Sequence, residues 1–522
     1  MTYFEVTREK MFPLAVIVSL LVCAIGAFLL FDAFASVTQG SASYLSRTRA
    51  DLYYWLFYKY PEGTVSAYAA TPTATSTDYA RSIPVLLYHG ESAATGNTPL
   101  ATFIDQMHAL KRDGWHTITL EQLQAFMKQG AKLPDKSFVL TFDDGRRDTF
   151  YPSDPVLKDL DYTAVMFVIT GLSLPDQGKP QNFYLNKNEL QYMVDSGRWE
   201  LQSHGDMDHL VYHVQSTTDL TQKAKTVDGH FMSDKFWNDS AGRFETDAEF
   251  ADRLRTDLTN AKKTLEKDFG QPVFTYAYPF NDFGQDTVNF PGATSVVAQV
   301  VPTIYTFSFY QHWPGNGDSF NYPDPNAYMI KRIEPHINWS GSDLIAALDE
   351  GRAKPLPYTA THFGNEWVGI WGTTSSGNTL SLTADADTSG ATAFLDGSSW
   401  WRDYSFTTSV NLIAGESVAL LARNQNDADY LACSYSTQSL TIERHTGTNQ
   451  VDIAHARFSI APGQVTLGMS AKGNEVQCFA NGAQVGSATF SGVPSGGIGV
   501  QVWDHNHGVA RSEFTAMNVQ SL

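Results

Sequence analysis

The chain has 522 residues and a mass of 57.7 kDa, a length that suggests about three domains. Hydrophobic residues make up 43% and charged residues 17%, which excludes a wholly disordered or coiled-coil chain. The net charge of −19 repels phosphate backbones, so we expect no nucleic acid partner. Only three cysteines are present, too few for a disulfide scaffold.

The first 80 residues predict a membrane attachment. The run from Phe12 to Phe31 has no charged residue, and a helix over it would span about 30 Å, the hydrocarbon thickness of a bilayer. A cleaved signal peptide ending near Ala35 is the alternative, but the run is longer than a usual signal core. We expect a cytoplasmic tip and signal anchor over 1–40, followed by an aromatic segment and flexible linker over 41–80.

Two different patterns fill the rest of the chain. Over 81–357, buried strands such as PVLLYH and SFVLTF alternate with amphipathic helices, which predicts an α/β domain shaped as a (β/α) barrel. Over 358–522, short alternating runs such as SVALLARN and QVTLGMSA are separated by turn residues. This second pattern predicts an all-β sandwich.

Titratable residues gather at the predicted ends of the barrel strands. The strand SFVLTF ends in Asp143 and Asp144, and two adjacent carboxylates at a strand end resist joint ionisation unless a cation is bound. His204 and His209 follow the strand WELQ and could reach the same cation. The strand PVLLYH ends in His89, a residue suited to proton exchange near neutrality.

These elements, in this order, resemble the polysaccharide deacetylases of the NodB homology type, family 4 of the carbohydrate esterases. TFDDG with SHGDMDH carries the resemblance most specifically, PVLLYHG less so and YAYPF loosely. The segments FIDQMHALKRDGWHTITL and FETDAEFADRLRTDLTNAKKTLEKDFG are similar to the branch that includes poly-β-1,6-N-acetylglucosamine deacetylases. The resemblance covers about residues 83–350.

The resemblance implies a role for each matching position. Asp143 would be the catalytic base and His89 the general acid, while the Phe280 backbone N–H would help to form the oxyanion hole. The expected ligands of one divalent metal ion are Asp144, His204 and His209. Where many family members have an arginine in the fourth motif, this chain has Ala277. Arg332 is a candidate replacement, and His336 is a second candidate acid.

The implied reaction is hydrolysis of N-acetyl groups on an extracellular N-acetylhexosamine polysaccharide, such as poly-N-acetylglucosamine. Zinc is the expected metal, with iron, nickel or cobalt as alternatives. The expected partners are the polysaccharide, the membrane through the N-terminal helix, and the machinery of exopolysaccharide synthesis or export. We expect the barrel and the sandwich to lie outside the cytoplasm, in the periplasm or at the cell exterior.

The C-terminal region resembles concanavalin A-like, laminin-G-like modules, on the segments WWRDYSF, VQCFANGAQVG and GGIGVQVWD. Such modules bind glycans, so Trp400, Trp401 and Trp503 are candidates for stacking on sugars, although core packing is the alternative for each. Cys433 and Cys478 are expected to point inward. Whether they form a disulfide stays open, because the sequence does not show that their strands are adjacent.

Two other functions fit part of the pattern. Two histidines and one carboxylate also suit a non-haem iron oxygenase, but the second aspartate would then have no task. A membrane-anchored glycan-binding protein with an inactive barrel is the other alternative. The complete set of expected catalytic residues favours the deacetylase.

Overall fold

The computed structural model describes residues 16, 19–20, 22–27, 79–91, 96–175, 183–216, 226–312, 319–426, 428–447, 449–460 and 463–522. The described residues near the N-terminus are helical, but most of the expected anchor and nearly all of the expected linker lie outside the described residues. Within the described part of the chain, no helix combines the length and apolar character needed to cross a membrane. The membrane anchor therefore stays a prediction.

Parallel strands form a nearly closed barrel, as the sequence predicts. In order around the sheet they are β1 (Val85–Tyr88), β3 (Ser137–Phe142), β4 (Ala164–Val168), β5 (Trp199–Ser203), β10 (Thr275–Ala277), β11 (Phe307–Gln311) and β12 (Met329–Arg332), with the short β2 (His116–Thr117) beside β3. A parallel bridge between Leu86 and Ile333 brings the two ends of this order together. All strand ends that carry the expected site therefore meet at one edge.

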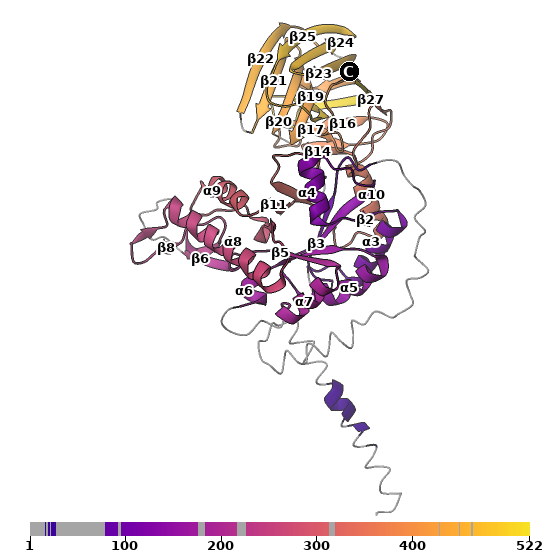
Figure 1. The fold of residues 1–522 in the computed structure, drawn as a ribbon. Coiled ribbons are helices and arrows are strands. Elements are labelled where there is room, and N and C mark those ends of the chain that lie inside the picture. The colour runs from indigo at the N-terminus through magenta and orange to yellow at the C-terminus, as the bar shows by residue number, and fades with distance from the viewer. Residues whose placement is uncertain are drawn as a thin grey trace, which may run out of the picture.

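Helices surround the barrel (Figure 1). They are α3 (Leu100–Arg112), α4 (Leu120–Gln129), α5 (Arg147–Leu160), α6 (Thr170–Ser173), α7 (Lys187–Asp195), α8 (Asp247–Phe269), α9 (Ala293–Val300) and α10 (Gly341–Gly351), with 3₁₀ turns at Pro279–Asn281 and Val301–Thr303. Local sequence sets their limits. In α8, Thr246 and Glu249 form a reciprocal capping box, and Gly270 ends the helix with φ 66°. Such a cap contributes about 1 kcal/mol.

The side-chain alternation of the strands decides which residues face the barrel interior. On β3, Val139 packs in the cluster inside the barrel, whereas Leu140 packs in the cluster under the helices. Successive side chains of a strand point to opposite faces of the sheet. Asp143 follows Val139 by an even number of residues, so its side chain also points into the barrel. On β12, Ile330 belongs to the inner cluster, so Arg332 also points inward, toward the same edge.

An insertion follows the strand that carries the histidines. It contains two small hairpins, β6 (Val211–Gln215) with β7 (Thr226–His230) and β8 (Trp237–Asn238) with β9 (Arg243–Phe244). The insertion extends to one side of the barrel next to α8 (Figure 1). Arg253 of α8 holds it by donating hydrogen bonds to the carbonyl oxygens of Phe231 and Asp234, both at 2.8 Å.

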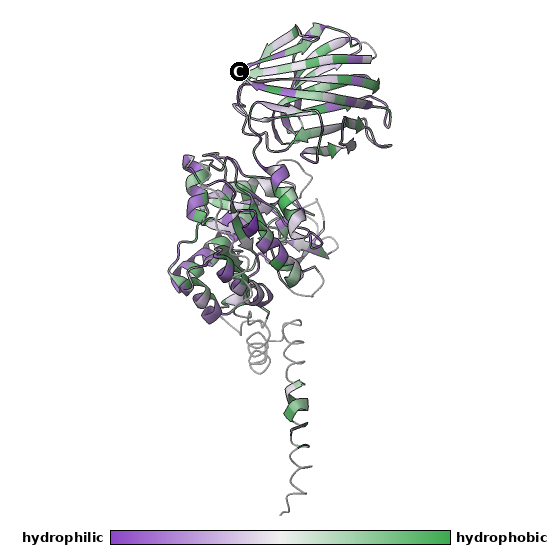
Figure 2. Ribbon diagram, turned by 90° about the vertical axis from the view of Figure 1, so that its right-hand side faces the viewer, coloured by the Kyte–Doolittle hydropathy of each residue, from purple (hydrophilic) through white to green (hydrophobic). Residues whose placement is uncertain are grey.

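The C-terminal region is a two-sheet antiparallel sandwich, which agrees with the predicted all-β fold. One sheet has the order β15-β16-β27-β18-β23-β24-β25 with β13 beside β27, and the other has the order β14-β17-β26-β19-β20-β21-β22. Alternating hydropathy is visible along these strands (Figure 2).

The strand bounds in the sandwich follow in chain order. They are β13 (Tyr358–Ala360), β14 (Trp367–Trp371), β15 (Thr373–Ser375), β16 (Leu380–Thr383), β17 (Gly390–Leu395), β18 (Tyr404–Ala414), β19 (Ser417–Asn426), β20 (Asp429–Ser436), β21 (Ser439–Thr446), β22 (Asn449–Arg457), β23 (Gly463–Lys472), β24 (Glu475–Ala480), β25 (Ala483–Thr489), β26 (Gly497–Trp503) and β27 (Arg511–Ser521). Cys433 of β20 and Cys478 of β24 form a disulfide across the two sheets, with Cα atoms 6.0 Å apart. This answers the question that the sequence left open.

The sandwich contacts the barrel at the amino-terminal edge of the barrel strands. Trp401 donates its indole N–H to the Lys354 carbonyl at 2.8 Å, and Lys354 donates its backbone N–H to the Gly397 carbonyl at 2.7 Å. The Arg81 guanidinium, just before β1, lies 4.4 Å from the centre of a Trp400 ring. The site residues follow the opposite, carboxyl ends of the strands, so the sandwich does not line the site.

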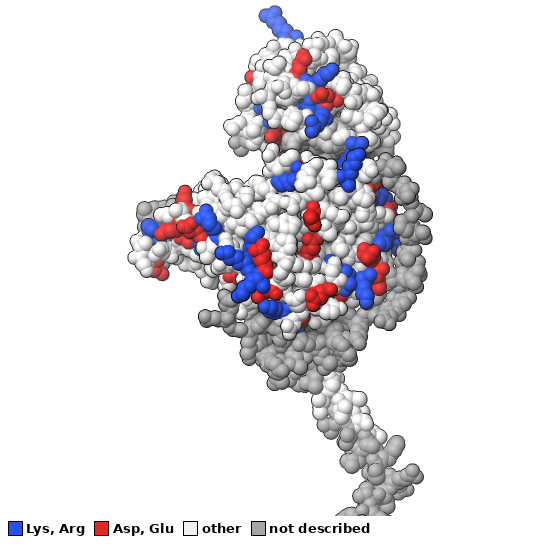
Figure 3. Space-filling model, in the orientation of Figure 1, with Lys and Arg blue, Asp and Glu red and all other residues white. Residues whose placement is uncertain are grey.

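Charged side chains are mixed on the surface. On the face in Figure 3, lysines and arginines lie beside aspartates and glutamates over the barrel, and the sandwich shows fewer charges. Exposed ion pairs on the molecule include Arg243 with Glu249 and Arg255 with Asp252, both at 2.6 Å. Exposed pairs of this kind contribute at most about 1 kcal/mol each.

Candidate metal centre and catalytic residues

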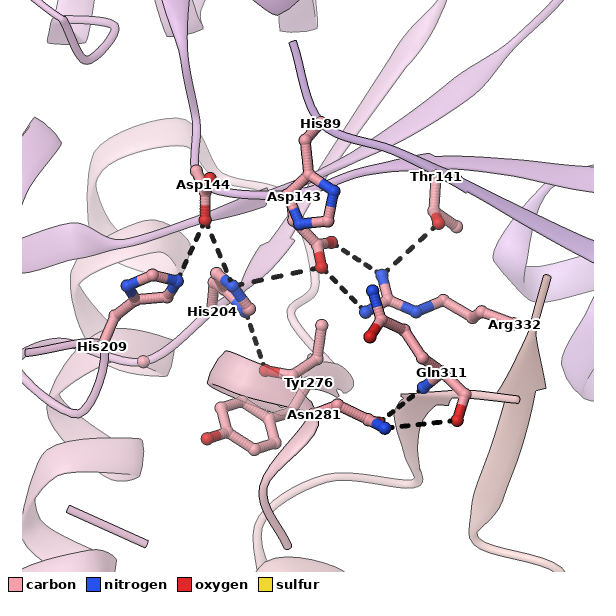
Figure 4. A network of polar contacts seen from close by, with 12 residues as sticks. His89, Thr141, Asp143, Asp144, His204, His209, Tyr276, Asn281, Gln311 and Arg332 are labelled. Carbon is pink, nitrogen blue, oxygen red and sulfur yellow. Dashed lines mark hydrogen bonds and ion pairs between the residues drawn. The ribbon is translucent and has the colours of Figure 1, made fainter. Parts of the chain in front are cut away.

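Two barrel strands bring three ligand-type side chains to one point. Asp144 follows β3 in a left-handed conformation with φ 74°, and His204 follows β5 directly. The Asp144 Oδ1 atom lies 3.1 Å from His209 Nε2 and 3.5 Å from His204 Nε2 (Figure 4). The three ligand atoms all lie within 4.8 Å of one another. The structure therefore groups the trio that the sequence singled out.

The donor set fits a divalent cation. In the described part of the chain, the buried Asp144 Oδ1 accepts no hydrogen bond. His204 Nδ1 lies 2.8 Å from the Ala277 carbonyl oxygen, which can accept the Nδ1 proton and leave Nε2 free as a ligand. Burial raises the pKa of Asp144, but its contacts with His204 and His209 outweigh burial and hold that pKa well below its usual value. One carboxylate and two imidazoles suit zinc and similar metals.

Hydrogen bonds from α8 and β10 fix the loop between His204 and His209. Asp257 of α8 accepts the backbone N–H of Asp206 at 3.0 Å and that of the next residue at 2.8 Å. Asp208 is buried and accepts the Tyr276 hydroxyl at 2.6 Å. Gly205 has φ 75°, and a Cβ there would collide with the Asp208 carboxylate. Asp257 from outside the loop and Asp208 within it therefore hold the shape of the loop.

Asp143 lies beside the trio and is bound by a buried arginine. Arg332 donates to both oxygens of Asp143, at 2.6 Å and 2.8 Å (Figure 4). Burial raises the pKa of Asp143, but the charges of Arg332 and His204 outweigh it, so the pKa lies below its usual value. Asp143 is thus an ionised carboxylate beside the trio, 4.0 Å from His204 Nε2. An ionised carboxylate in this position can accept a proton.

His89 follows β1, lies beside Asp143 (Figure 4) and has a carboxylate partner. Its Nδ1 lies 3.1 Å from Glu334 Oε1, and Gln311 donates to the other Glu334 oxygen at 3.0 Å. Burial lowers the pKa of His89, but the hydrogen bond with Glu334 and the charges of Asp144 and Asp143 outweigh burial, so the pKa lies above its usual value. A protonated imidazole in this position can act as a general acid.

His336 occupies the rim of the site. It lines a cavity of about 200 Å³ together with His89 and Glu334, but its side chain is exposed and its ring packs against Trp339 at 4.8 Å between ring centres. His89 has a carboxylate partner and lies nearer the aspartates. The geometry therefore favours His89 as the acid.

Phe280 sits on a strained turn directly after β10. Phe280 and the next residue both have φ 57°, a left-handed conformation that costs an ordinary residue about 1–3 kcal/mol. The N–H groups of Tyr278, Asn281 and Asp282 donate to backbone carbonyls, whereas no such bond is found for the Phe280 N–H among the described residues. The Phe280 N–H lies near Asp144, His204 and His209, so it could donate a hydrogen bond to an oxyanion that forms there.

Some residues of the site were not foreseen from the sequence. Glu334 and Gln311 hold His89, and Asn281 accepts the Gln311 backbone N–H at 2.7 Å, which joins His89 to the Phe280 turn. Arg146 lies 3.7 Å from Asp144 Oδ2 and pairs with Asp148 at 2.7 Å. Arg146 directly follows the TFDDG motif, and this position in the sequence could have identified it as a residue of the site. No sequence pattern identifies Glu334 as the partner of His89, because their contact depends on closure of the barrel.

The three tryptophans of the sandwich have different environments. Trp401 is fully buried and its ring packs in the core, which is the alternative that the sequence left open for it. Trp400 is half-buried beneath Arg81 at the contact with the barrel, which occupies one face of its ring. Trp503 is 39% exposed and is the candidate among the three whose ring is open to a ligand.

Comparison with known sequences gives matches for the barrel. Residues 130–293 match the family described as polysaccharide deacetylase. A poly-beta-1,6-N-acetyl-D-glucosamine N-deacetylase of Staphylococcus aureus is 27% identical over 188 residues, covering 35% of this chain and 53% of that protein. An Escherichia coli enzyme of the same name is 21% identical over 187 residues, covering 34% of this chain and 27% of its own length. The chain thus spans about half, or less, of these relatives.

Similar solved structures include a de-N-acetylase from Aggregatibacter actinomycetemcomitans, with a TM-score of 0.41 and 18% identity over 51% of this chain and 99% of the other. A carbohydrate binding module from Bacillus subtilis has a TM-score of 0.26 and 15% identity, over 30% of this chain and 96% of the other. The family match covers Asp143, Asp144, His204, His209 and Phe280. The site lies mainly in a region that is similar in sequence to polysaccharide deacetylases.

Proposed function

We propose that this chain is a polysaccharide N-deacetylase that requires a divalent metal ion. The observation that carries the proposal is that a set of metal-ligand side chains and a separate carboxylate, Asp143, lie next to each other at one edge of the barrel. Asp144 with the two histidines would hold the cation, while Asp143 is kept out of that set by Arg332. A ligand carboxylate beside a separate base is the arrangement that hydrolysis needs, because the base must stay free to take a proton.

The chain's own residues divide the chemistry among them. A bound cation would polarise the acetamide carbonyl and favour deprotonation of water. Asp143 accepts the proton from the attacking water, and the Phe280 N–H donates to the oxygen that becomes negative. His89 then gives its proton to the sugar nitrogen, since an amine anion is a poor leaving group. Glu334 favours the protonated form of His89 before this step.

The proposed substrate is an N-acetylglucosamine polymer, with the β-1,6-linked polymer first. Support comes from the names of the relatives in Staphylococcus aureus and Escherichia coli. Chitin-like β-1,4 chains, peptidoglycan and other exopolysaccharides are the alternatives. A non-enzymatic glycan-binding protein is the second candidate function, since Trp503 is exposed on the sandwich.

Acetate release tests the proposal directly. The full chain in detergent is incubated with N-acetylglucosamine oligomers of β-1,6 and β-1,4 linkage, with chelator and then with added zinc, cobalt or nickel. We expect release that stops with chelator and returns with metal. Release that is insensitive to chelator would contradict the metal requirement. Oligomer binding without release, in a metal-loaded protein, would favour the glycan-binding function.

We also propose that the protein is anchored in a membrane with its domains outside the cytoplasm, near the machinery that makes or exports the polymer. The support is the apolar run over Phe12–Phe31 and the disulfide, which suits an oxidising compartment. Protease added to intact cells, or to spheroplasts for a periplasmic protein, should remove the barrel and the sandwich. Complete protection in both preparations would contradict this placement.

A further inference from the structure

The insertion after the metal histidines brings one imidazole to the edge of the site. His230 ends β7, and its ring stacks on Phe280 with centres 4.8 Å apart and planes at 13°. The Phe280 ring also lies 4.6 Å from the ring of His209. Phe280 therefore separates His230 from a residue of the metal trio. His209 lies on the side of the site away from Arg332 (Figure 4), and the Phe280 ring that contacts His209 also contacts His230.

A buried carboxylate fixes the orientation of this imidazole. Asp282, whose side chain is 1% exposed, lies 3.0 Å from His230 Nδ1, and it also accepts the Ser233 hydroxyl and, at 2.8 Å, the Gly284 N–H. The hydrogen bond with Asp282 raises the pKa of His230. Because Nδ1 is used in this way, the ring is held with Nε2 directed away from Asp282.

The remaining nitrogen is available. Within the described residues, His230 Nε2 has no hydrogen-bond partner, and the side chain is 29% exposed. A pair that only joined the insertion to the Phe280 turn would not need this open nitrogen, because Ser233 already makes that link. Nε2 can donate to or accept from a sugar hydroxyl, according to its protonation.

We propose that His230 is a substrate-binding residue, which contacts a sugar unit next to the one that is deacetylated. This inference rests on the proposed function and extends it, because it assigns to the insertion a contact with the polymer. The stack on Phe280 sets the distance of His230 from the metal trio, and Asp282 sets its direction. In this arrangement the neighbouring sugar would lie over Phe280, which is 41% exposed.

Kinetics with matched variants test this assignment. His230→Ala should raise the KM for a β-1,6-linked N-acetylglucosamine pentasaccharide about tenfold with kcat within threefold, as expected for one lost hydrogen bond to the ligand. His230→Gln keeps a donor and an acceptor and should restore KM to within threefold of the wild type. For His230→Ala, the fold-loss of kcat/KM should be about tenfold greater with the pentasaccharide than with p-nitrophenyl acetate, because p-nitrophenyl acetate has no neighbouring sugar.

Two controls separate binding from structure. His213→Ala changes an exposed histidine of the same hairpin, which is also paired with an aspartate, at 2.9 Å, and should leave KM within twofold of the wild type. Ser233→Ala removes the other side-chain donor to Asp282 but leaves the imidazole. If His230→Ala lowers kcat without raising KM, as a loosened Phe280 turn would, the assignment is overturned.

A binding measurement keeps this inference distinct from the proposed function. Calorimetry with the pentasaccharide and metal-loaded full-length Asp143→Asn protein, with and without His230→Ala, reports the contact without turnover. A tenfold weaker affinity supports the contact even if the wild type releases no acetate, an outcome that would refute only the deacetylase. Equal affinities, or no measurable affinity in either protein, overturn the assignment of His230.

Discussion

The edge of the barrel that carries the candidate site buries several charged side chains next to one another, whereas the main cluster of the sandwich is hydrophobic. At the barrel edge, Asp143, Asp144, His204 and Arg332 are buried together and interact with one another. The main cluster inside the sandwich is hydrophobic and is crossed by the disulfide between Cys433 and Cys478, and the buried Arg423 of β19 is paired with Asp403 at 3.1 Å. Burying charge is costly unless each group is paired, so a cluster of buried charges at the end of barrel strands is a candidate functional site.

Because of this contrast, we expect substitutions in the two regions to have different effects. The barrel edge should respond to single substitutions with large losses of activity and modest changes in fold. The sandwich should respond with changes in stability and little change in catalysis, because it contacts the barrel at the opposite edge. The following four predictions test this division, beginning with the largest expected effect.

Removal of one metal ligand should abolish the function of the barrel. His204→Ala deletes an imidazole whose Nε2 faces Asp144 at 3.5 Å, so we expect loss of the bound metal and at least about a thousandfold loss of acetate release, about 4 kcal/mol. Metal content is measured by mass spectrometry beside activity. The exposed His213 provides the control, His213→Ala. Full metal content with normal activity would contradict the ligand assignment.

Neutralising the base should stop turnover and spare the metal. Asp143→Asn keeps the shape of the side chain but cannot accept the proton, so acetate release should fall about 10²–10⁴-fold. The metal content should stay near that of the wild type, because Asp144 and the histidines are intact. A melting temperature is needed as well, since Arg332 then carries a buried charge without its partner. Activity within tenfold of the wild type would remove Asp143 from the mechanism.

Deleting the disulfide should weaken the sandwich alone. The double change Cys433→Ser and Cys478→Ser opens a link with a sequence separation of 45, which predicts a loss of about 2–4 kcal/mol in the free energy of unfolding of the sandwich. Acetate release at 25 °C should stay within twofold. Denaturant unfolding, followed by fluorescence and by activity, compares the two regions. Cys23→Ser, which changes the unpaired cysteine, is the control, and an equal loss of activity and sandwich stability would show that the regions are coupled.

A change in Glu334, the carboxylate partner of His89, should shift the pH profile of kcat/KM. Glu334→Gln removes the hydrogen-bonded charge that raises the pKa of His89, while burial still lowers it. The protonated fraction of His89 near neutrality should then fall. We expect about a tenfold lower kcat/KM at pH 8, about 1.4 kcal/mol, and a basic limb moved to lower pH. Glu121→Gln on the exposed face of α4 is the control, and an unmoved basic limb would show that His89 is not the acid.

Local patterns in the sequence were sufficient for much of the architecture. Alternating strands and helices predicted the barrel, and the strand end at Asp143 and Asp144 predicted the location of the chemistry. The spacing of His204 and His209 on one loop predicted their approach to a single cation. Each of these inferences concerns residues close together in the chain, where strand direction and loop length limit where a side chain can go.

Other features were decided only by the tertiary structure. The contact of Glu334 with His89 joins the last strand of the barrel to the first, and the ion pair of Arg332 with Asp143 joins the last strand to β3. Both depend on the register in which Leu86 pairs with Ile333. The burial of Trp401 depends in the same way on how the sandwich meets Lys354. Sequence alone determined which groups can do the chemistry, whereas closure of the barrel decided their partners, because contacts between distant segments depend on register and packing that no local pattern encodes.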